Sequence, residues 1–152
     1  MIRPLLWDIS KERMKQISQS FPGRYVQLRN ICDFIKPFVE ESGFSENETY
    51  EILMAVDEAC SNIIEHAYGA EGIGDIDCSC SFEPPILTVL LRDNGKSFSP
   101  RDIPKPNIKA SLKNRKNHGL GFFIMQKIMD EVQYSPNMGN GNQLILRKTL
   151  EK

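Results

Sequence analysis

The sequence has no long apolar run, and its positive and negative charges nearly cancel. None of its apolar stretches approaches the roughly 20 residues that a membrane-spanning helix needs. The formal net charge of the 152-residue chain is −1, so no overall attraction draws it to nucleic acid or to an anionic membrane. The first residues, M-I-R-P-L-L-W-D, lack the apolar core and cleavage site of a signal peptide. We therefore expect a cytoplasmic protein with no direct nucleic-acid binding and no membrane contact.

The 4 cysteines form no C-x-x-C pair, so their spacing indicates neither a zinc site nor a redox dithiol. Cys60 falls in a predicted helix, and Cys78 and Cys80 share one face of a predicted strand. Reduced, partly buried thiols are the expectation. A chain of this length is most simply one domain, here residues 1–152.

The stretch Glu51–Gly69 predicts a single amphipathic helix with an unusual second stripe. Its apolar residues recur at three- and four-residue steps, as in a helix packed on a core: Ile52, Val56, Ala59, Ile63 and Ala67. Glu58, Asn62 and His66 follow at four-residue steps, so α-helical geometry places their side chains on one side. The helix contains no Lys or Arg to neutralise them. The stripe indicates the wall of a site, with a solvated surface stripe as the alternative.

The remaining pattern predicts helices grouped against hairpin-connected strands. Pro37 should kink or end the first long helix, and Ser45 with Glu48 forms an S-x-x-E capping box at the start of the second. The predicted elements are a possible edge strand at 14–20, helices at 24–42 and from 45, strands at 76–82 and 86–91, a helix from 119, and strands at 132–135 and 143–150. This order indicates an α+β fold, a two-layer α/β sandwich with three main helices on one face of a mainly antiparallel mixed sheet.

Two short glycine motifs border a long polar loop. Asp93-x-Gly95 follows a central strand, where a carboxylate can accept a hydrogen bond from an amine and the glycine lets a flat ring approach. Gly119-x-Gly121 opens a helix, where free N–H groups favour phosphate. The loop 99–118 between them carries cations that could close over an anion: Lys105, Lys109, Lys113, Arg115 and Lys116. Each motif alone is weak evidence for a binding site, and the order of the motifs along the predicted elements is what indicates one.

That ordered set resembles the GHKL-type ATPases, which bind nucleotide on a Bergerat fold. Within them it is most similar to the anti-sigma factor serine/threonine kinases of bacteria, over about residues 24–150. Asp57–Tyr68 looks like the N-box, with the E-A-x-x-N-x-x-x-H-A-Y core that is specific for this subgroup. Asp93–Phe98 looks like the first glycine box and Gly119–Met125 like the second. The resemblance implies a single ATPase domain with an N-terminal extension at 1–20 and an ATP lid at 99–118.

The resemblance also implies roles for individual residues. Glu58 would be the catalytic general base, Asn62 would bind Mg²⁺, and Asp93 would read the adenine amine of ATP or ADP beside Gly95. Gly119 and Gly121 would present amides to the phosphates. The implied nucleotide-binding set is completed by His66, Ser97, Arg115, Lys116 and Leu120. For His66 a structural hydrogen bond at the helix end is the alternative to a direct role.

In two places the sequence departs from the family pattern. Ser97 stands where the wider superfamily often has a second glycine, and Asn117-His118 precede Gly119 where related kinases often place a basic residue. Arg115 or Lys116 could contact the terminal phosphate instead.

Three functions follow from the resemblance. The first is a kinase that phosphorylates a serine of a STAS-type anti-anti-sigma protein and sequesters a sigma factor, as a homodimer built on the N-terminal segment and first helix. The alternatives are a non-catalytic, nucleotide-dependent switch and a free-standing module of a histidine kinase. The extension Met1–Ser10, which contains Trp7, has no assigned role and could pack on a neighbour or on the sheet.

Overall fold

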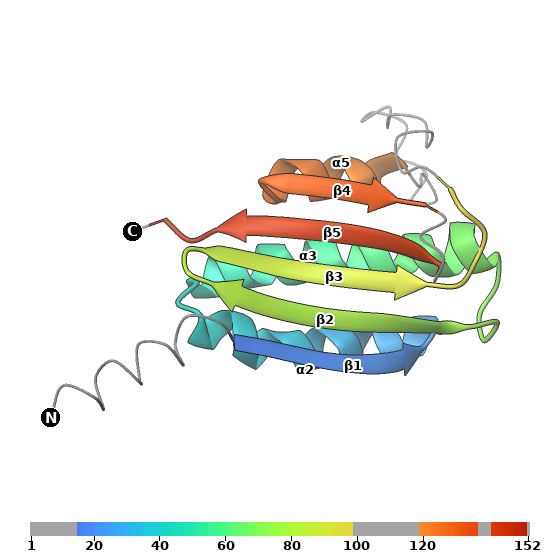
Figure 1. Ribbon diagram of the computed structural model, residues 1–152, viewed down its shortest axis with the longest axis horizontal. Helices are drawn as coiled ribbons and strands as arrows, with labels where there is room; N and C mark the ends of the chain where they lie inside the picture. The colour runs from blue at the N-terminus through green and yellow to red at the C-terminus, as the bar shows by residue number, and fades with distance from the viewer. Residues whose placement is uncertain (1–14, 99–118, 137–140, 152) are drawn as a thin grey trace, which may run out of the picture.

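The computed structural model describes residues 15–98, 119–136 and 141–151. They form two layers, an open sheet and a layer of helices packed on one of its faces (Figure 1). The predicted α+β sandwich is therefore confirmed. The predicted lid at 99–118 and most of the N-terminal extension lie outside the described residues.

The sheet has five strands in the order β1-β2-β3-β5-β4, and each neighbouring pair is antiparallel. The strands are β1 (Lys15–Pro22), β2 (Asp75–Glu83), β3 (Ile86–Asp93), β4 (Glu131–Ser135) and β5 (Asn142–Thr149). The possible edge strand at the N-terminus is confirmed as β1. β5 lies between β3 and β4, so the last strand of the chain occupies an interior position of the sheet.

The first long helix, α2 (Leu28–Glu41), follows a short 3₁₀ turn, η1 (Tyr25–Gln27). Pro37 lies inside α2, so the proline does not end the helix early. The second helix, α3 (Glu46–Asn62), begins at the predicted capping box. The Ser45 hydroxyl accepts from the Glu48 amide at 3.1 Å, and the Glu48 carboxylate accepts from the Ser45 amide at 3.0 Å.

The prediction of one uninterrupted helix from Glu51 to Gly69 is wrong at its C-terminal end. The chain leaves α-helical geometry after Asn62 and forms a π-helical turn, η2 (Ile63–Tyr68). Gly69 closes this turn in the left-handed conformation, with φ 79°. A π turn holds more residues than an α turn, so the step from Asn62 to His66 is not the α-helical step on which the predicted stripe rests.

The third helix, α5 (Gly119–Ile128), packs on α3 and leads directly into β4. Met125 of α5 is fully buried, and Met129, just beyond the end of the helix, is buried too. β4 and β5 pair as the sequence predicts, although residues 137–140 of the intervening turn lie outside the described residues.

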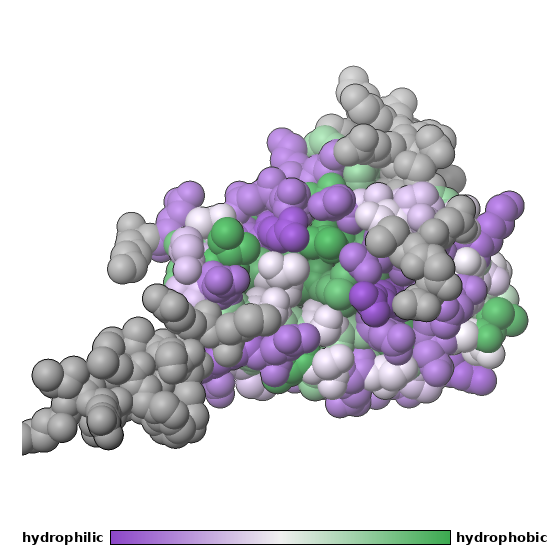
Figure 2. Space-filling model, in the orientation of Figure 1, coloured by the Kyte–Doolittle hydropathy of each residue, from purple (hydrophilic) through white to green (hydrophobic). Residues whose placement is uncertain are grey.

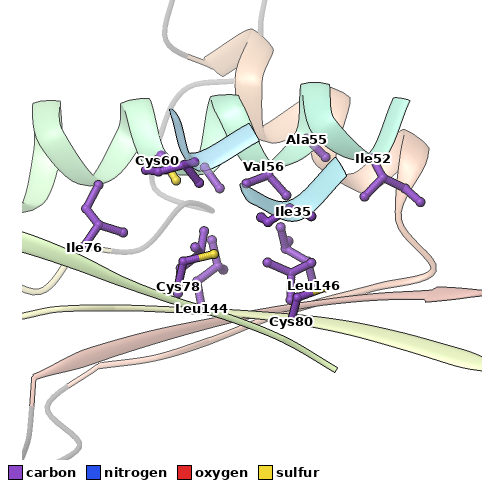
Figure 3. Close-up of a cluster of buried hydrophobic side chains, with 14 of the residues drawn as sticks. Ile35, Ile52, Ala55, Val56, Cys60, Ile76, Cys78, Cys80, Leu144 and Leu146 are labelled. Carbon is purple, nitrogen blue, oxygen red and sulfur yellow. The ribbon is translucent and has the colours of Figure 1, made fainter. Parts of the chain in front are cut away.

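The core lies between the two layers (Figure 3). Alternate side chains of β2 point into it, among them Ile76, Cys78 and Cys80, and they meet Val56 and Cys60 of α3. All cysteines are free, as expected, and burial raises the pKa of the Cys78 thiol to about 12.

The opposite face of the sheet is turned toward the viewer in Figure 2, where polar side chains surround a small apolar centre. Arg92 of β3 donates through Nε to the Gln143 side chain of β5 at 3.2 Å, and Arg147 pairs with Glu131. Among the described residues, no helix is long and apolar enough to cross a membrane.

Candidate functional site

Asp93 is the last residue of β3 and is held in place by two hydrogen bonds to one carboxylate oxygen. Its side chain is only 4% exposed. Oδ1 accepts from the Gly95 amide at 2.9 Å and from Asn142 Nδ2 at 3.0 Å. Burial raises the pKa of the carboxyl, and these two hydrogen bonds oppose the rise because they favour the ionised form. Oδ2 takes part in neither bond.

Asn142 is a component of the site that sequence reasoning missed. It is buried at the start of β5, directly opposite Asp93 in the strand register. Besides Asp93, its Nδ2 donates to the Gly95 carbonyl at 3.0 Å, and its Oδ1 accepts from the Ser97 hydroxyl at 2.7 Å. Asn142 thus ties the start of β5 to Asp93, Gly95 and Ser97 of the first glycine box. One sequence signal could have pointed to Asn142. It is a polar residue at a position of β5 whose alternate neighbours, Leu144 and Leu146, face the core.

The loop after Asp93 is fastened to η2. The Lys96 amide donates to the Ala67 carbonyl at 2.7 Å, and a Cβ placed on Gly95 would lie 2.6 Å from the Ala67 carbonyl carbon and oxygen. Real Cβ atoms do not approach backbone so closely, so a glycine is required here. Tyr68 adds a second link, because its hydroxyl accepts from the Asn94 amide at 3.0 Å and donates to the Asp75 carbonyl.

Glu58 faces the second glycine motif. A Cβ placed on Gly121 would lie 2.5 Å from Glu58 Oε2, so the first turn of α5 rests directly against this carboxylate. Burial raises the pKa of Glu58, and the negative charge of Asp57 raises it further. A carboxylate with a raised pKa is a stronger base than an exposed glutamate.

Asn62 is the last residue of α3, one turn after Glu58. Its side chain is 5% exposed, and Nδ2 has no hydrogen-bond partner among the described residues. A buried amide donor is normally satisfied, so Nδ2 is a donor that a ligand oxygen could accept from.

His66 lies on η2 beside the residues that precede the predicted lid. Its ring centroid is 5.5 Å from that of Phe98, and the Phe98 ring is 5.4 Å from that of Tyr134. The Phe98 amide also donates to the Tyr134 hydroxyl at 3.0 Å. The contact supports a structural role for His66 in holding the end of the first glycine box, and Tyr134 is a second residue that the sequence did not reveal.

The structure therefore brings the predicted residues into two clusters joined by η2. One contains Asp93, Gly95 and Ser97, and the other contains Glu58 and Gly121. Gly119 and Leu120 are the first residues of α5, while Arg115 and Lys116 lie outside the described residues.

These residues fit a magnesium nucleotide. The printed bonds to Asp93 both use Oδ1, the Asn62 Nδ2 donor has no partner among the described residues, and Gly121 in the first turn of α5 lies beside the Glu58 carboxylate. These groups have the chemistry to recognise an exocyclic amine through Asp93, a hard cation through the side-chain oxygen of Asn62, and phosphate oxygens through the first amides of α5.

Comparison with known proteins agrees with this chemistry. The sequence model of the histidine kinase-like ATPase domain family matches residues 21–148. Serine-protein kinase RsbW of Bacillus cereus (strain AH187) is 27% identical over 137 residues, which cover 84% of this chain and 82% of that protein. RsbW of Bacillus thuringiensis subsp. konkukian (strain 97-27) matches with the same identity and coverage.

Among solved structures, a chain of the SiaB–SiaC complex from Pseudomonas aeruginosa has the same fold. The TM-score is 0.60 at 12% sequence identity, and the match covers 98% of this chain and 96% of that chain. Since the family description spans most of the sequence, including both glycine motifs and the helix that carries Glu58 and Asn62, the chain belongs to the histidine kinase-like ATPase domain family.

Proposed function

We propose that the protein is an ATP-dependent protein serine kinase of the partner-switching type. It transfers a phosphoryl group to a serine of a STAS-type anti-anti-sigma protein and, in its other state, sequesters a sigma factor. The observation that carries the proposal is the approach of Glu58 to Gly121, which places a carboxylate base beside the predicted phosphate-binding turn. The likeness to proteins named serine-protein kinase supports it.

Asp93 is assigned to adenine. Oδ1 is engaged by Gly95 and Asn142, which fixes the plane of the carboxylate and leaves Oδ2 to accept from the exocyclic amine. The low exposure of Asp93 strengthens this hydrogen bond because little water competes for it.

Asn62 is assigned to Mg²⁺ through its side-chain oxygen. The ion would neutralise phosphate charge, which is the main requirement of phosphoryl transfer. Glu58 orients the attacking serine hydroxyl and accepts its proton, and Gly119 and Gly121 donate amides to the phosphates. Arg115 or Lys116 of the lid is assigned to the terminal phosphate.

The test is Glu58→Gln, which keeps the size of the side chain and removes its basicity. Purified STAS-type proteins of the same organism are incubated with γ-labelled ATP, and phosphoserine is identified by mass spectrometry. We expect transfer to fall by about 10²–10⁴-fold, the usual contribution of a general base, while calorimetric ATP affinity stays close to native. Glu51→Gln, an exposed change on the same helix, is the control.

Two results would overturn parts of the proposal. Full transfer by Glu58→Gln would remove Glu58 from catalysis. Nucleotide-dependent binding of a STAS-type protein without transfer by the native chain would establish the non-catalytic switch instead.

A further inference from the structure

The loop that follows Asp93 is fastened at both of its ends by tyrosine hydroxyls. The Asn94 amide donates to the Tyr68 hydroxyl at 3.0 Å, and the Phe98 amide donates to the Tyr134 hydroxyl at 3.0 Å. Tyr68 belongs to η2 and Tyr134 to β4, so the two contacts come from elements far apart in the sequence. Figure 1 shows the loop leaving the end of β3 and running toward α5 and β4.

Both tyrosine rings are held in place by packing. A Cβ placed on Gly74 would lie 2.5 Å from the Tyr68 ring, so this ring lies against the backbone just before β2. The Tyr68 hydroxyl also donates to the Asp75 carbonyl, which fixes the oxygen that accepts from the loop. The Tyr134 ring packs on the Phe98 ring at a centroid distance of 5.4 Å, and both tyrosines pack against the core. The two hydroxyls are therefore fixed points for the loop.

Both hydroxyls lie close enough to Asp93 to be affected by its charge. Burial is the main cause that raises the pKa of each phenol, and the hydrogen bond accepted from the loop opposes the rise. The charge of Asp93 raises the pKa of both phenols further. The other two of the 4 tyrosines in the chain, Tyr25 and Tyr50, are exposed. The two partly buried tyrosines thus both belong to the surroundings of Asp93.

We propose that Tyr68 and Tyr134 are positioning residues that give the nucleotide site its preference for adenine over guanine. The inference rests on the proposed assignment of Asp93 to the adenine amine. The Gly95 amide donates to Asp93 Oδ1 from within the loop, so the tyrosines place the amide that orients the carboxylate. Adenine carries an amine donor where guanine carries a carbonyl oxygen, so a fixed carboxylate accepts from the first base and repels the second. A site built around such a hydrogen bond loses discrimination when the acceptor is displaced.

The first measurement follows amide hydrogen exchange by NMR in the nucleotide-free protein. Tyr68→Phe keeps the ring and removes the hydroxyl, so we expect faster exchange at Asn94, and Tyr134→Phe should have the same effect at Phe98. Tyr50→Phe is the matched control, because it removes an exposed hydroxyl from α3 and should leave both amides at their native rates. Native rates in both of the other variants would overturn the proposal, because the hydroxyls would then not hold the loop.

The second measurement compares the dissociation constants of magnesium ATP and magnesium GTP by calorimetry. The net contribution of one hydrogen bond corresponds to about two- to tenfold weaker ATP binding, whereas GTP gains nothing from Asp93 and should bind as in the native protein. The preference for ATP should therefore fall in Tyr68→Phe and in Tyr134→Phe, and fall furthest in the double variant.

Two outcomes would count against the inference in different ways. A general loss of stability would weaken ATP and GTP alike, and this result, or an unchanged preference, would overturn the role of the tyrosines while leaving the kinase proposal intact. A native chain that binds neither nucleotide would overturn the kinase proposal and this inference together.

Discussion

Asp93 is buried and Glu58 is partly buried, and their neighbours act on the pKa values of the two acids in opposite directions. Asp57 adds a negative charge near Glu58 and raises its pKa beyond the effect of burial. Asn142 and Gly95 donate to Asp93 and lower its pKa against the effect of burial. The Asp57 charge therefore favours proton uptake at Glu58, as suits a base, and the two hydrogen bonds at Asp93 favour its ionised form, as suits an acceptor.

The first prediction concerns Asp57→Asn. Glu58 must be ionised to accept a proton, so the transfer rate should fall as pH decreases through its raised pKa. Removal of the Asp57 charge lowers that pKa, and the acidic limb of the pH–rate profile should move to lower pH. Asp57→Glu keeps the charge and should leave the limb near its native position. A limb that stays in place in Asp57→Asn would show that another group controls it.

The second prediction concerns Asn142→Ala. Two hydrogen bonds from Nδ2 are lost, and at about 1 kcal/mol net for each the dissociation constant for ATP should rise on the order of tenfold or more. The pKa of Asp93 should rise further, so ATP affinity should begin to fall at a higher pH than in the native protein as the solution is acidified. Calorimetry at several pH values measures both effects. Gln143→Ala, one residue along β5 on the opposite face, should bind ATP normally.

At the scale of elements, η2 is the piece that the sequence did not predict. The pattern of Glu51–Gly69 is helical throughout, and hydrophobic spacing does not separate an α turn from a π turn over six residues. The π turn differs from an α turn in its tertiary contacts. Ala67 of η2 lies against Gly95, and its carbonyl accepts a hydrogen bond from the Lys96 amide of a distant loop. The π-helical backbone that joins the motifs was therefore not predicted from the sequence.

The third prediction compares Gly95, which lies against Ala67 of η2, with Gly69, which ends η2. In Gly95→Ala the new methyl group would meet Ala67 backbone, which cannot move aside, and we expect a loss of about 1–3 kcal/mol in unfolding free energy together with weakened ATP binding. In Gly69→Ala the new methyl group would meet no atom, and only the left-handed backbone at this position is unfavourable for alanine. We expect that substitution to cost about 1–2 kcal/mol of unfolding free energy. Urea unfolding and calorimetry should show that Gly69→Ala retains ATP affinity. Native affinity in Gly95→Ala would contradict the proposed site.

At the scale of the whole molecule, the two layers share one core that contains three of the cysteines. Cys60 of α3 and Cys78 and Cys80 of β2 are all buried, and Cys32 of α2 is partly exposed. Burial raises the pKa of Cys32 to about 11 and that of Cys78 to about 12. The inner thiols become reactive only when the layers separate.

The fourth prediction is a labelling experiment with a thiol reagent. Cys32 should react in the native protein, and the other thiols should react at rates that track the unfolding free energy in urea. Magnesium ATP at a hundredfold excess over its dissociation constant should stabilise the fold by about 2.7 kcal/mol and slow the inner thiols accordingly. Simultaneous reaction of all four would contradict the common core.

The sequence predicted the architecture well because strand alternation, capping and hairpin spacing are local signals. β2, β3 and the capping box at Ser45 were found from a few residues each. Contacts between distant segments have no such signal. Asn142 meets Asp93 across 49 positions, and its role became visible only when β5 was placed beside β3.

That placement bears on how the protein is made. β5 follows the other four described strands in the sequence, yet it fills an interior position of the sheet and carries the asparagine that donates to the Asp93 carboxylate. A nascent chain that has completed α3 and β3 still lacks the support of Asp93. During synthesis the Asp93 carboxylate therefore gains this support only after β5 has been made, so the proposed nucleotide site is completed later than the strands that surround it.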